Sequence, residues 1–294
     1  MNTQNSRTAL VLGGGGSTGN AWLIGVVAGL AEAGLDVTGA DLVVGTSAGA
    51  TAAAQITAAA PAELLTMTLQ APPPRGTSGR PGPVTASAVV DHLERSRQLI
   101  AASTDAADMR RRFGAAAIER AAASDESDRW RKIVAPRLPS QHWSDQRVLI
   151  TAVDAETGEP VVFDRDSGVE LVDAVAASCS SGFAYRIGDR RFIDGGYRTN
   201  AENADLAAGY GRVLVLSPFG GRSLVPRDWG LWLSDQVEAL RAGGSAVETI
   251  FPDADAEHLF GPNGMDLSLR PDAARAGHRQ GRVVASRVGE SWQA

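Results

Sequence analysis

The residues best suited to chemistry lie at 45–49, which read Gly-Thr-Ser-Ala-Gly. This order fits the Gly-x-Ser-x-Gly nucleophile elbow, in which a serine occupies a cramped turn between a strand and a helix. Gly45 and Gly49 would relieve the crowding around Ser47, and a largely apolar run at 41–44 precedes the turn. Because the same pattern arises by chance in glycine-rich turns, the motif alone leaves a nucleophile and a simple turn equally open.

A run of glycines at 13–16, followed by Ser-Thr-Gly at 17–19, offers a second functional element. Consecutive glycines between a strand and a helix can direct several backbone amides to one place. The free N–H groups and the dipole at a helix N-terminus also favour an anion. We therefore expect this run to form an oxyanion hole, which stabilises the negative charge that develops during acyl transfer.

The same glycines permit a different interpretation. Gly14, Gly16 and Gly19 fit the Gly-x-Gly-x-x-Gly fingerprint of dinucleotide-binding proteins. That fingerprint also expects an acid about 20 residues later, at the end of the second strand. Here the second strand ends at 45–47, and the nearby acids Asp36 and Asp41 precede it. A nucleotide-binding or regulatory module that uses 14–19 remains the alternative hypothesis.

The third element is an Asp-Gly-Gly sequence at 194–196, which follows a short predicted strand at 191–193. A carboxylate at the end of a strand could accept the serine proton, although a simple turn is the better explanation of this sequence on its own. Strand ends of an open parallel sheet meet at one edge, where active sites of α/β folds lie. A histidine-based triad would have to use His258 or His278, which we expect to be surface residues.

The elements that position these residues follow from the pattern of apolar residues. Apolar runs predict strands, and three-to-four spacing predicts helices. Strand, glycine turn and helix occur twice in succession, which predicts a parallel α/β sheet with crossover helices. We expect one domain over 1–294, a motif-bearing core over about 8–217, and a helical excursion over about 85–135. A Pro- and Gly-rich loop at 71–83 is either a connector or a lid. The predicted strands cover 8–12, 41–44, 147–153, 160–163, 191–193 and 212–217, and the helices cover 20–33, 48–60 and 169–178.

Composition excludes several classes of protein. The net charge of −6 over 294 residues argues against a nucleic-acid partner, because such proteins need concentrated positive charge. One cysteine and four scattered histidines give neither a disulfide framework nor a metal site. No apolar stretch is long enough for a membrane-spanning helix, and the first residues lack the pattern of a secretory signal. We expect a cytoplasmic protein without a metal or cofactor.

The order of the glycine run, the Gly-Thr-Ser-Ala-Gly turn and the Asp-Gly-Gly sequence resembles the patatin-like phospholipase family over about the first two hundred residues. The resemblance implies a three-layer α/β fold with a central, mainly parallel sheet flanked by helices. It also implies hydrolysis of acyl esters of lipids by a Ser-Asp dyad without histidine. The substrate would be a phospholipid, lysophospholipid or neutral lipid, reached through a possible transient contact with a membrane surface.

Carried over by position, the resemblance makes Ser47 the nucleophile, Asp194 its base, and the amides of Gly14, Gly15 and Gly16 the oxyanion hole. Gly45, Gly49, Gly195 and Gly196 would support the two turns, and Asn200 stands where the family often has an asparagine. Thr18 departs from the pattern, because many bacterial members have an arginine or lysine there. Without a basic side chain at this position, the amides and the helix dipole would have to stabilise the oxyanion.

Overall fold

The computed structural model describes residues 6–70, 86–121 and 126–293. Within these residues one sheet contains eight strands in the order β5-β6-β3-β2-β1-β7-β8, with β4 paired to β3. The pairs β1–β2, β1–β7, β2–β3 and β7–β8 are parallel, and those of β3 with β4 and β6 and of β5 with β6 are antiparallel. The strands are β1 (Thr8–Leu12), β2 (Leu42–Gly45), β3 (Val148–Asp154), β4 (Pro160–Phe163), β5 (Tyr185–Ile187), β6 (Arg190–Asp194), β7 (Arg212–Leu216) and β8 (Ala246–Ile250).

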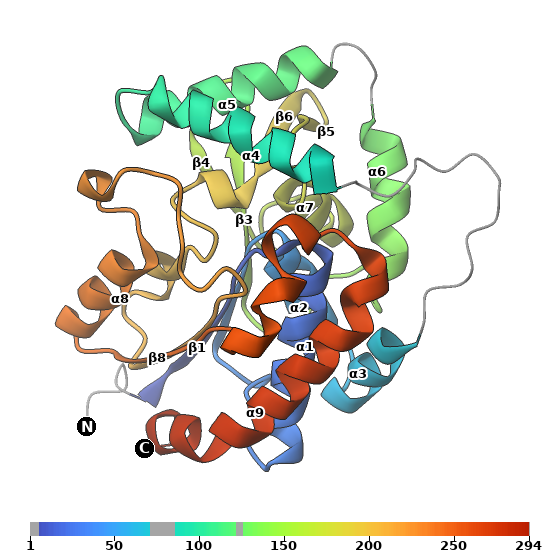
Figure 1. The fold of residues 1–294 in the computed structure, drawn as a ribbon, viewed down its shortest axis with the longest axis vertical. Coiled ribbons are helices and arrows are strands. Elements are labelled where there is room, and N and C mark those ends of the chain that lie inside the picture. The colour runs from blue at the N-terminus through green and yellow to red at the C-terminus, as the bar shows by residue number, and fades with distance from the viewer. Residues whose placement is uncertain (1–5, 71–85, 122–125, 294) are drawn as a thin grey trace.

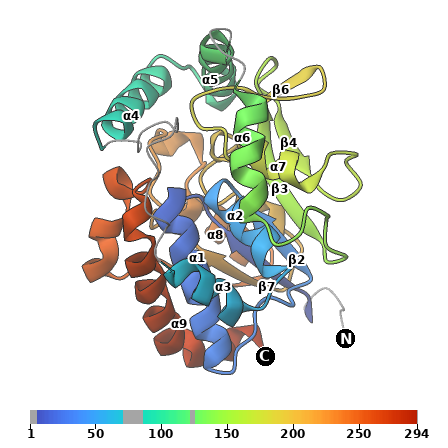
Figure 2. The same ribbon diagram turned by 90° about the vertical axis from the view of Figure 1, so that its right-hand side faces the viewer.

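Helices cover both faces of the sheet (Figures 1 and 2). One face carries α1, α2, α7 and α9, and the other carries α8. α4 and α5 lie together beyond the end of the sheet that bears β4 and β6. The helices are α1 (Gly16–Glu32), α2 (Ala48–Ile56), α3 (Pro61–Leu69), α4 (Ala86–Ala101), α5 (Ala106–Ala121), α6 (Ser127–Val134), α7 (Leu171–Ser178), α8 (Leu233–Ala242) and α9 (Arg270–Trp292).

The central strands are buried on both faces. Leu10 and Leu12 of β1 belong to the core beneath α1 and α9, whereas Ala9 and Val11 belong to the core beneath α8. Strands buried on both sides have continuous apolar sequences, which explains why β1, β2 and β7 are recognisable as short apolar runs. The expected three-layer α/β fold with a mainly parallel sheet is confirmed.

β3 brings two strands together end to end. β4 occupies one edge of β3 over residues 150–153. β2 pairs with 148–150 and β6 pairs with 152–154, so both lie along the opposite edge. β2 ends at Gly45 beside Ile150, and the antiparallel β6 ends at Asp194 beside Ala152. The carboxyl ends of β2 and β6 therefore approach each other from opposite directions, on either side of the level of Thr151.

α1 and α9 pack so closely that only glycine fits at their contact. A Cβ atom added to Gly25 or Gly29 of α1 would lie 2.2 Å from a carbonyl oxygen of α9. A Cβ added to Gly277 or Gly281 of α9 would lie 2.3 Å from a carbonyl oxygen of α1. Because α1 begins directly after the glycine run, this contact with α9 holds the helix that carries the run.

Several elements differ from the sequence-based expectation. The sheet does not end at 217, because β8 follows, and the short β5 was not expected. The segment 270–292, for which no helix was predicted, is one long helix, α9, and it carries His278. The excursion at 85–135 consists of α4, α5 and α6, and the loop at 71–83 lies outside the described residues.

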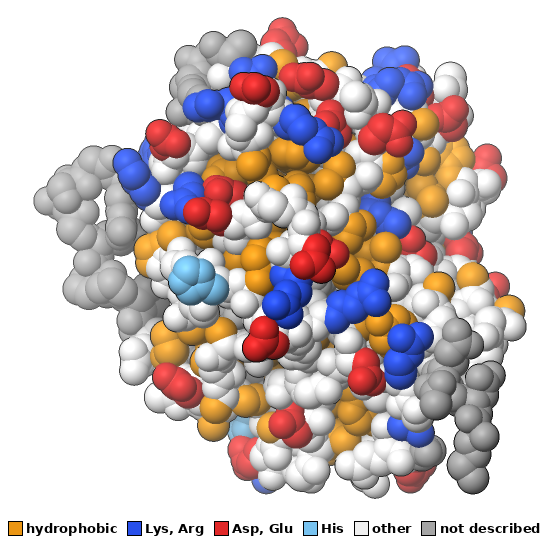
Figure 3. All heavy atoms as spheres, turned by 180° about the vertical axis from the view of Figure 1, so that it is seen from behind, with side chains coloured by type: hydrophobic (Ala, Val, Ile, Leu, Met, Phe, Trp, Pro, Cys, Tyr) orange, Lys and Arg blue, Asp and Glu red, His pale blue; other side chains and the backbone are white. Residues whose placement is uncertain are grey.

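One face of the molecule mixes charges of both signs. On the face opposite to that of Figure 1, acidic and basic side chains are interspersed (Figure 3). Over the described part of the chain, none of the helices combines the length and the apolar character that a membrane crossing requires.

Candidate active site

Ser47 occupies a strained turn between β2 and α2. Its backbone has φ 52° and ψ −113°, a positive φ that residues with a side chain rarely adopt. Two residues at the end of α7 hold this backbone in place. The Ser47 N–H donates to Ser178 Oγ at 2.9 Å, and the Cys179 thiol donates to the Ser47 carbonyl oxygen at 3.1 Å. The turn thus has the strand, strain and helix of a nucleophile elbow.

The two glycines that flank this turn are required by close contacts. A Cβ on Gly49 would lie 1.8 Å from the carbonyl oxygen of Leu12, and a Cβ on Gly45 would lie 2.7 Å from the Cα of Ala50. Any larger residue would therefore push α2 away from β1 or from β2. The Gly-x-Ser-x-Gly pattern is explained here by packing around the turn.

The side chains of Ser47 and Asp194 meet. Ser47 Oγ donates to Asp194 Oδ2 at 2.8 Å, and the Gly196 N–H donates to Asp194 Oδ1 at 2.8 Å. Burial raises the pKa of Asp194 to about 6, while the hydrogen bonds from Gly196 and Ser47 oppose the rise. The carboxylate therefore bonds the hydroxyl that it would have to deprotonate, and it is a stronger base than a solvated aspartate.

A buried polar cluster joins the two turns. Thr46 Oγ1 and Thr151 Oγ1 lie 2.9 Å apart. Asn203 Nδ2 donates to Thr46 Oγ1 and to the carbonyl oxygen of Gly195, each at 3.0 Å. Asn203 is fully buried and has a positive φ of 56°, a conformation that asparagine tolerates better than most residues. One amide thereby links the serine turn to the aspartate turn.

Asn200 lies one step further from the contact between Ser47 and Asp194. Its Oδ1 accepts hydrogen bonds from the backbone N–H groups of Glu202 and Asn203, and its Nδ2 donates to the carbonyl oxygen of Leu231. These contacts shape the loop that carries Asn203. The sequence singled out Asn200 but not Asn203, Ser178 or Cys179. The small polar run at 178–181, which begins at the last residue of a predicted helix, was the only signal for Ser178 and Cys179.

The glycine run lies next to Ser47. A Cβ on Gly14 would lie 3.6 Å from the Cβ of Ser47, and Gly16 has a positive φ of 68°. The Gly14 N–H donates to the carbonyl oxygen of Ala201 at 2.8 Å. Among the described residues, none accepts a hydrogen bond from the N–H of Gly15 or Gly16. Of the three amides expected in the oxyanion hole, Gly14 is thus already occupied, and Gly15 and Gly16 are available.

A positive charge reaches this loop from a distant part of the chain. Thr18 is buried, and its N–H donates to the carbonyl oxygen of Gly264. The Arg270 guanidinium, at the start of α9, donates to the carbonyl oxygen of Ser17 at 2.7 Å and to Asn20 Oδ1 at 3.1 Å. Burial, with a smaller effect of Arg137, lowers the pKa of Arg270 to about 10, so the side chain remains a cation at neutral pH. A guanidinium therefore lies at the first turn of α1 although position 18 is uncharged.

Other candidates are not assembled into this site. His278 Nε2 contacts Glu32 Oε2 at 2.6 Å, and His258 is exposed in a short 3-10 helix (Ala254–Leu259). In the ranges that the structure describes, no cluster of three or more His, Cys, Asp or Glu side chains is placed to hold a metal ion. The amides of Gly14 and Thr18, which a bound pyrophosphate would draw on, are used within the protein.

Comparisons with known proteins address the family. The sequence model of the patatin-like phospholipase family matches residues 10–207, a span that includes Ser47 and Asp194. A search of curated proteins finds no match. Among solved structures, the chain aligns with the crystal structure of VipD from Legionella pneumophila at 12% identity and a TM-score of 0.42, covering 96% of this chain and 67% of that chain.

Proposed function

The chain belongs to the patatin-like phospholipase family, and we propose that it cleaves acyl esters of lipids with Ser47 as nucleophile and Asp194 as base. The family consists of lipid acyl hydrolases, which sets the general class of activity. The observation that supports the assignment of residues is the 2.8 Å hydrogen bond from Ser47 Oγ to the buried carboxylate of Asp194.

In the first half of the proposed reaction, Asp194 takes the hydroxyl proton while Ser47 Oγ attacks the ester carbonyl carbon. The carbonyl oxygen becomes an oxyanion, which the amides of Gly15 and Gly16 stabilise, supported by the dipole of α1 and the charge of Arg270. The intermediate then expels the alcohol, which leaves with the proton held by Asp194. An acyl group remains on Ser47.

In the second half, Asp194 takes a proton from water, and the resulting hydroxide attacks the acyl-Ser47 carbonyl. Collapse of this second oxyanion breaks the bond to Ser47 Oγ, which recovers its proton from Asp194. The products are a carboxylic acid and the free enzyme. Every proton and electron pair in this proposed scheme moves between the substrate, water and the dyad.

Labelling with a fluorophosphonate probe tests the nucleophile. The wild-type protein should be labelled, and Ser47→Ala should abolish the label and lower hydrolysis of a lipid ester by at least about a thousandfold. Asp194→Asn should lower kcat by about 10²–10⁴-fold, the usual contribution of a general base. Ser234→Ala, on the exposed surface of α8, is the matched control and should keep both label and activity. Labelling that persists in Ser47→Ala contradicts the assignment.

We also propose a cytoplasmic enzyme that acts as one domain over 1–294 and meets its lipid substrate by transient contact with a membrane surface. The contacts of Arg270 and of Leu216, whose carbonyl oxygen accepts from Gly13, support the single domain, because they tie the region beyond residue 207 to the glycine run. Cosedimentation with lipid vesicles measures the surface contact; protein that stays in the supernatant at every lipid concentration contradicts it.

A further inference from the structure

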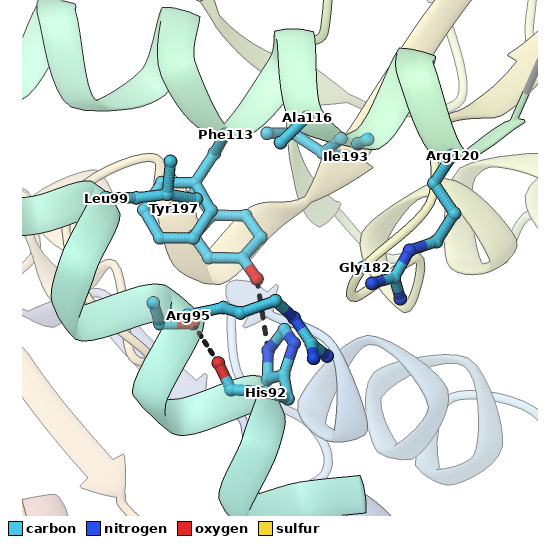
Figure 4. A pocket seen from close by; sticks show the side chains of 11 residues that line it. His92, Arg95, Leu99, Phe113, Ala116, Arg120, Gly182, Ile193 and Tyr197 are labelled. Atoms are coloured by element: carbon cyan, nitrogen blue, oxygen red, sulfur yellow. Dashed lines mark hydrogen bonds between the residues drawn. The ribbon is translucent and has the colours of Figure 1, made fainter.

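A cavity of about 70 Å³ lies beneath α4 and α5, next to the aspartate turn (Figure 4). Ile193 and Tyr197, which stand one residue before and three residues after Asp194, form part of its wall. The Tyr197 ring stacks on Phe113 of α5 with ring centroids 4.3 Å apart. The cavity therefore adjoins the proposed dyad through the turn that carries its carboxylate.

Three basic side chains from two helices converge on this cavity. His92 and Arg95 come from α4, and Arg120 reaches down from α5 toward Gly182 (Figure 4). A Cβ on Gly182 would lie 3.4 Å from Arg120 Nη1 and 3.7 Å from His92 Nδ1, so the guanidinium and the imidazole both lie close to Gly182. Burial, followed by the charges of Arg95 and Arg120, lowers the pKa of His92.

Within the described residues, the two arginines have no acidic partner. There no acidic side chain lines the cavity, and neither Arg95 nor Arg120 contacts a carboxylate. Other arginines of α4 and α5 do form ion pairs with acidic side chains. Arg97 of α4 lies 3.6 Å from Glu94, and Arg112 of α5 lies 2.8 Å from Asp108.

Arg95 and Arg120 are both exposed, and neither guanidinium is occupied by a counterion within the described residues. An anion bound between them would be attracted by both charges. The cavity is therefore suited to a negatively charged ligand.

A neutral donor, the Tyr197 hydroxyl, also lines the cavity. It lies 3.4 Å from His92 Nε2, and Ser181 Oγ lies 3.2 Å from the same nitrogen. Burial raises the pKa of Tyr197, so its hydroxyl keeps its proton. Guanidinium groups together with hydroxyls are the donors that proteins use for phosphate. The volume holds only a few water molecules, which suits a compact anion and excludes an acyl chain.

We infer that this cavity binds the phosphate of a phospholipid head group while the ester carbonyl of the same molecule lies at Ser47. Donors approach from α4, from α5 and from the turn after Asp194, an arrangement that matches the tetrahedral oxygens of phosphate better than a flat carboxylate. The inference rests on the proposed function and names the substrate class, a lipid ester with a phosphate close to the cleaved bond.

The test compares two esters with the same acyl chain, a monoacylglycerol phosphate and the matching monoacylglycerol, in mixed micelles of a neutral detergent. The double variant Arg95→Gln/Arg120→Gln should lower the ratio of kcat/KM for the phosphate ester to that for the neutral ester by at least about tenfold, mainly through KM. Arg97→Gln/Arg112→Gln removes the same charge from the same helices and should leave the ratio within about twofold. An unchanged ratio in the first variant, or an equal fall in the second, overturns the inference.

Calorimetric titration with inorganic phosphate separates the lipid from the free ion. Phosphate binding that disappears in Arg95→Gln/Arg120→Gln while the ester ratio stays unchanged would show a site for free phosphate and overturn the head-group assignment. If the wild-type protein cleaves neither ester, the proposed function fails, and cosedimentation with vesicles of phosphatidylcholine containing phosphatidate then tests the cavity. Weaker sedimentation of the cavity variant than of its control supports the site, and equal sedimentation overturns it.

Discussion

Both members of the proposed dyad are held in states that they would not adopt in a free chain. Ser47 has a positive φ, which costs of order 1–3 kcal/mol for a residue with a side chain. Asp194 is 7% exposed and has no cationic partner among the groups that shift its pKa. Contacts from α7 stabilise the serine turn, and the Gly196 amide stabilises the carboxylate. The strain and the burial together keep a hydroxyl and a stronger base in contact.

The raised pKa of Asp194 predicts the pH dependence of catalysis. A base must be deprotonated, so kcat/KM for an uncharged ester should rise as the pH increases through about 6 and level off above pH 7. A solvated aspartate would complete this rise by about pH 5. Initial rates between pH 4.5 and 8 measure the profile, with circular dichroism at each pH as the control for folding. A midpoint near 4 would contradict a buried carboxylate as the base.

At the scale of single residues, the sequence revealed the groups that must stand next to glycine. Ser47 and Asp194 lie in turns whose glycines are forced by close backbone contacts, such as Gly195, where a Cβ would lie 2.1 Å from Thr151 Oγ1. Asn203, Ser178 and Arg270 left no such trace. Their contribution depends on contacts between segments that are far apart in the chain, and no local pattern records those contacts.

At the scale of elements, strands buried on both faces were predictable because they are continuous apolar runs. β8 was missed because it lies at the edge of the sheet and has only two buried residues among its five. α9 was missed because alanine, glycine and glutamine form most of its buried face, so it lacks the apolar stripe that predicts a helix. The antiparallel direction of β6 could not be inferred from a run of three residues.

The contact between α1 and α9 gives a prediction for stability. Gly281→Ala places a Cβ 2.3 Å from the carbonyl oxygen of Val26, so the helices must separate, and we expect a loss of about 1–3 kcal/mol in the free energy of unfolding. Gly289→Ala on the same helix meets its nearest neighbour at 4.0 Å and should gain up to about 1 kcal/mol from helix propensity. Urea denaturation of both variants measures the difference; equal stabilities would contradict the close packing.

At the scale of the whole molecule, two buried acids make stability depend on pH. Burial raises the pKa of Glu202 to about 7 and that of Asp194 to about 6. In the unfolded chain both titrate near their ordinary values, about 4. Between about pH 4 and 7 the folded protein therefore binds more protons than the unfolded chain. These two groups lower the free energy of unfolding as the pH rises through that window.

Glu202 allows this effect to be measured away from the dyad. Ser217 Oγ donates to its carboxyl group, and a glutamine can still accept that hydrogen bond. As the pH rises from 4.5 to 8, Glu202 should lower the free energy of unfolding of the wild-type protein by about 3 kcal/mol. Glu202→Gln should remove this decrease. Urea denaturation at the two pH values measures it, with the exposed Glu290→Gln as control. Parallel losses in Glu202→Gln and in the wild-type protein would show that this carboxyl is not shifted.

The meeting of β2 and β6 along one edge of β3 has a consequence for how such a protein can diversify. The spacing between hydroxyl and carboxylate is set by the register of two pairings, which place Gly45 opposite Ile150 and Asp194 opposite Ala152. The described helices of the connection from α2 to β3, α4 and α5 among them, supply none of these paired residues. New charges or altered side chains on α4 and α5 can thus remodel what reaches the proposed reaction centre while the two pairings stay unchanged.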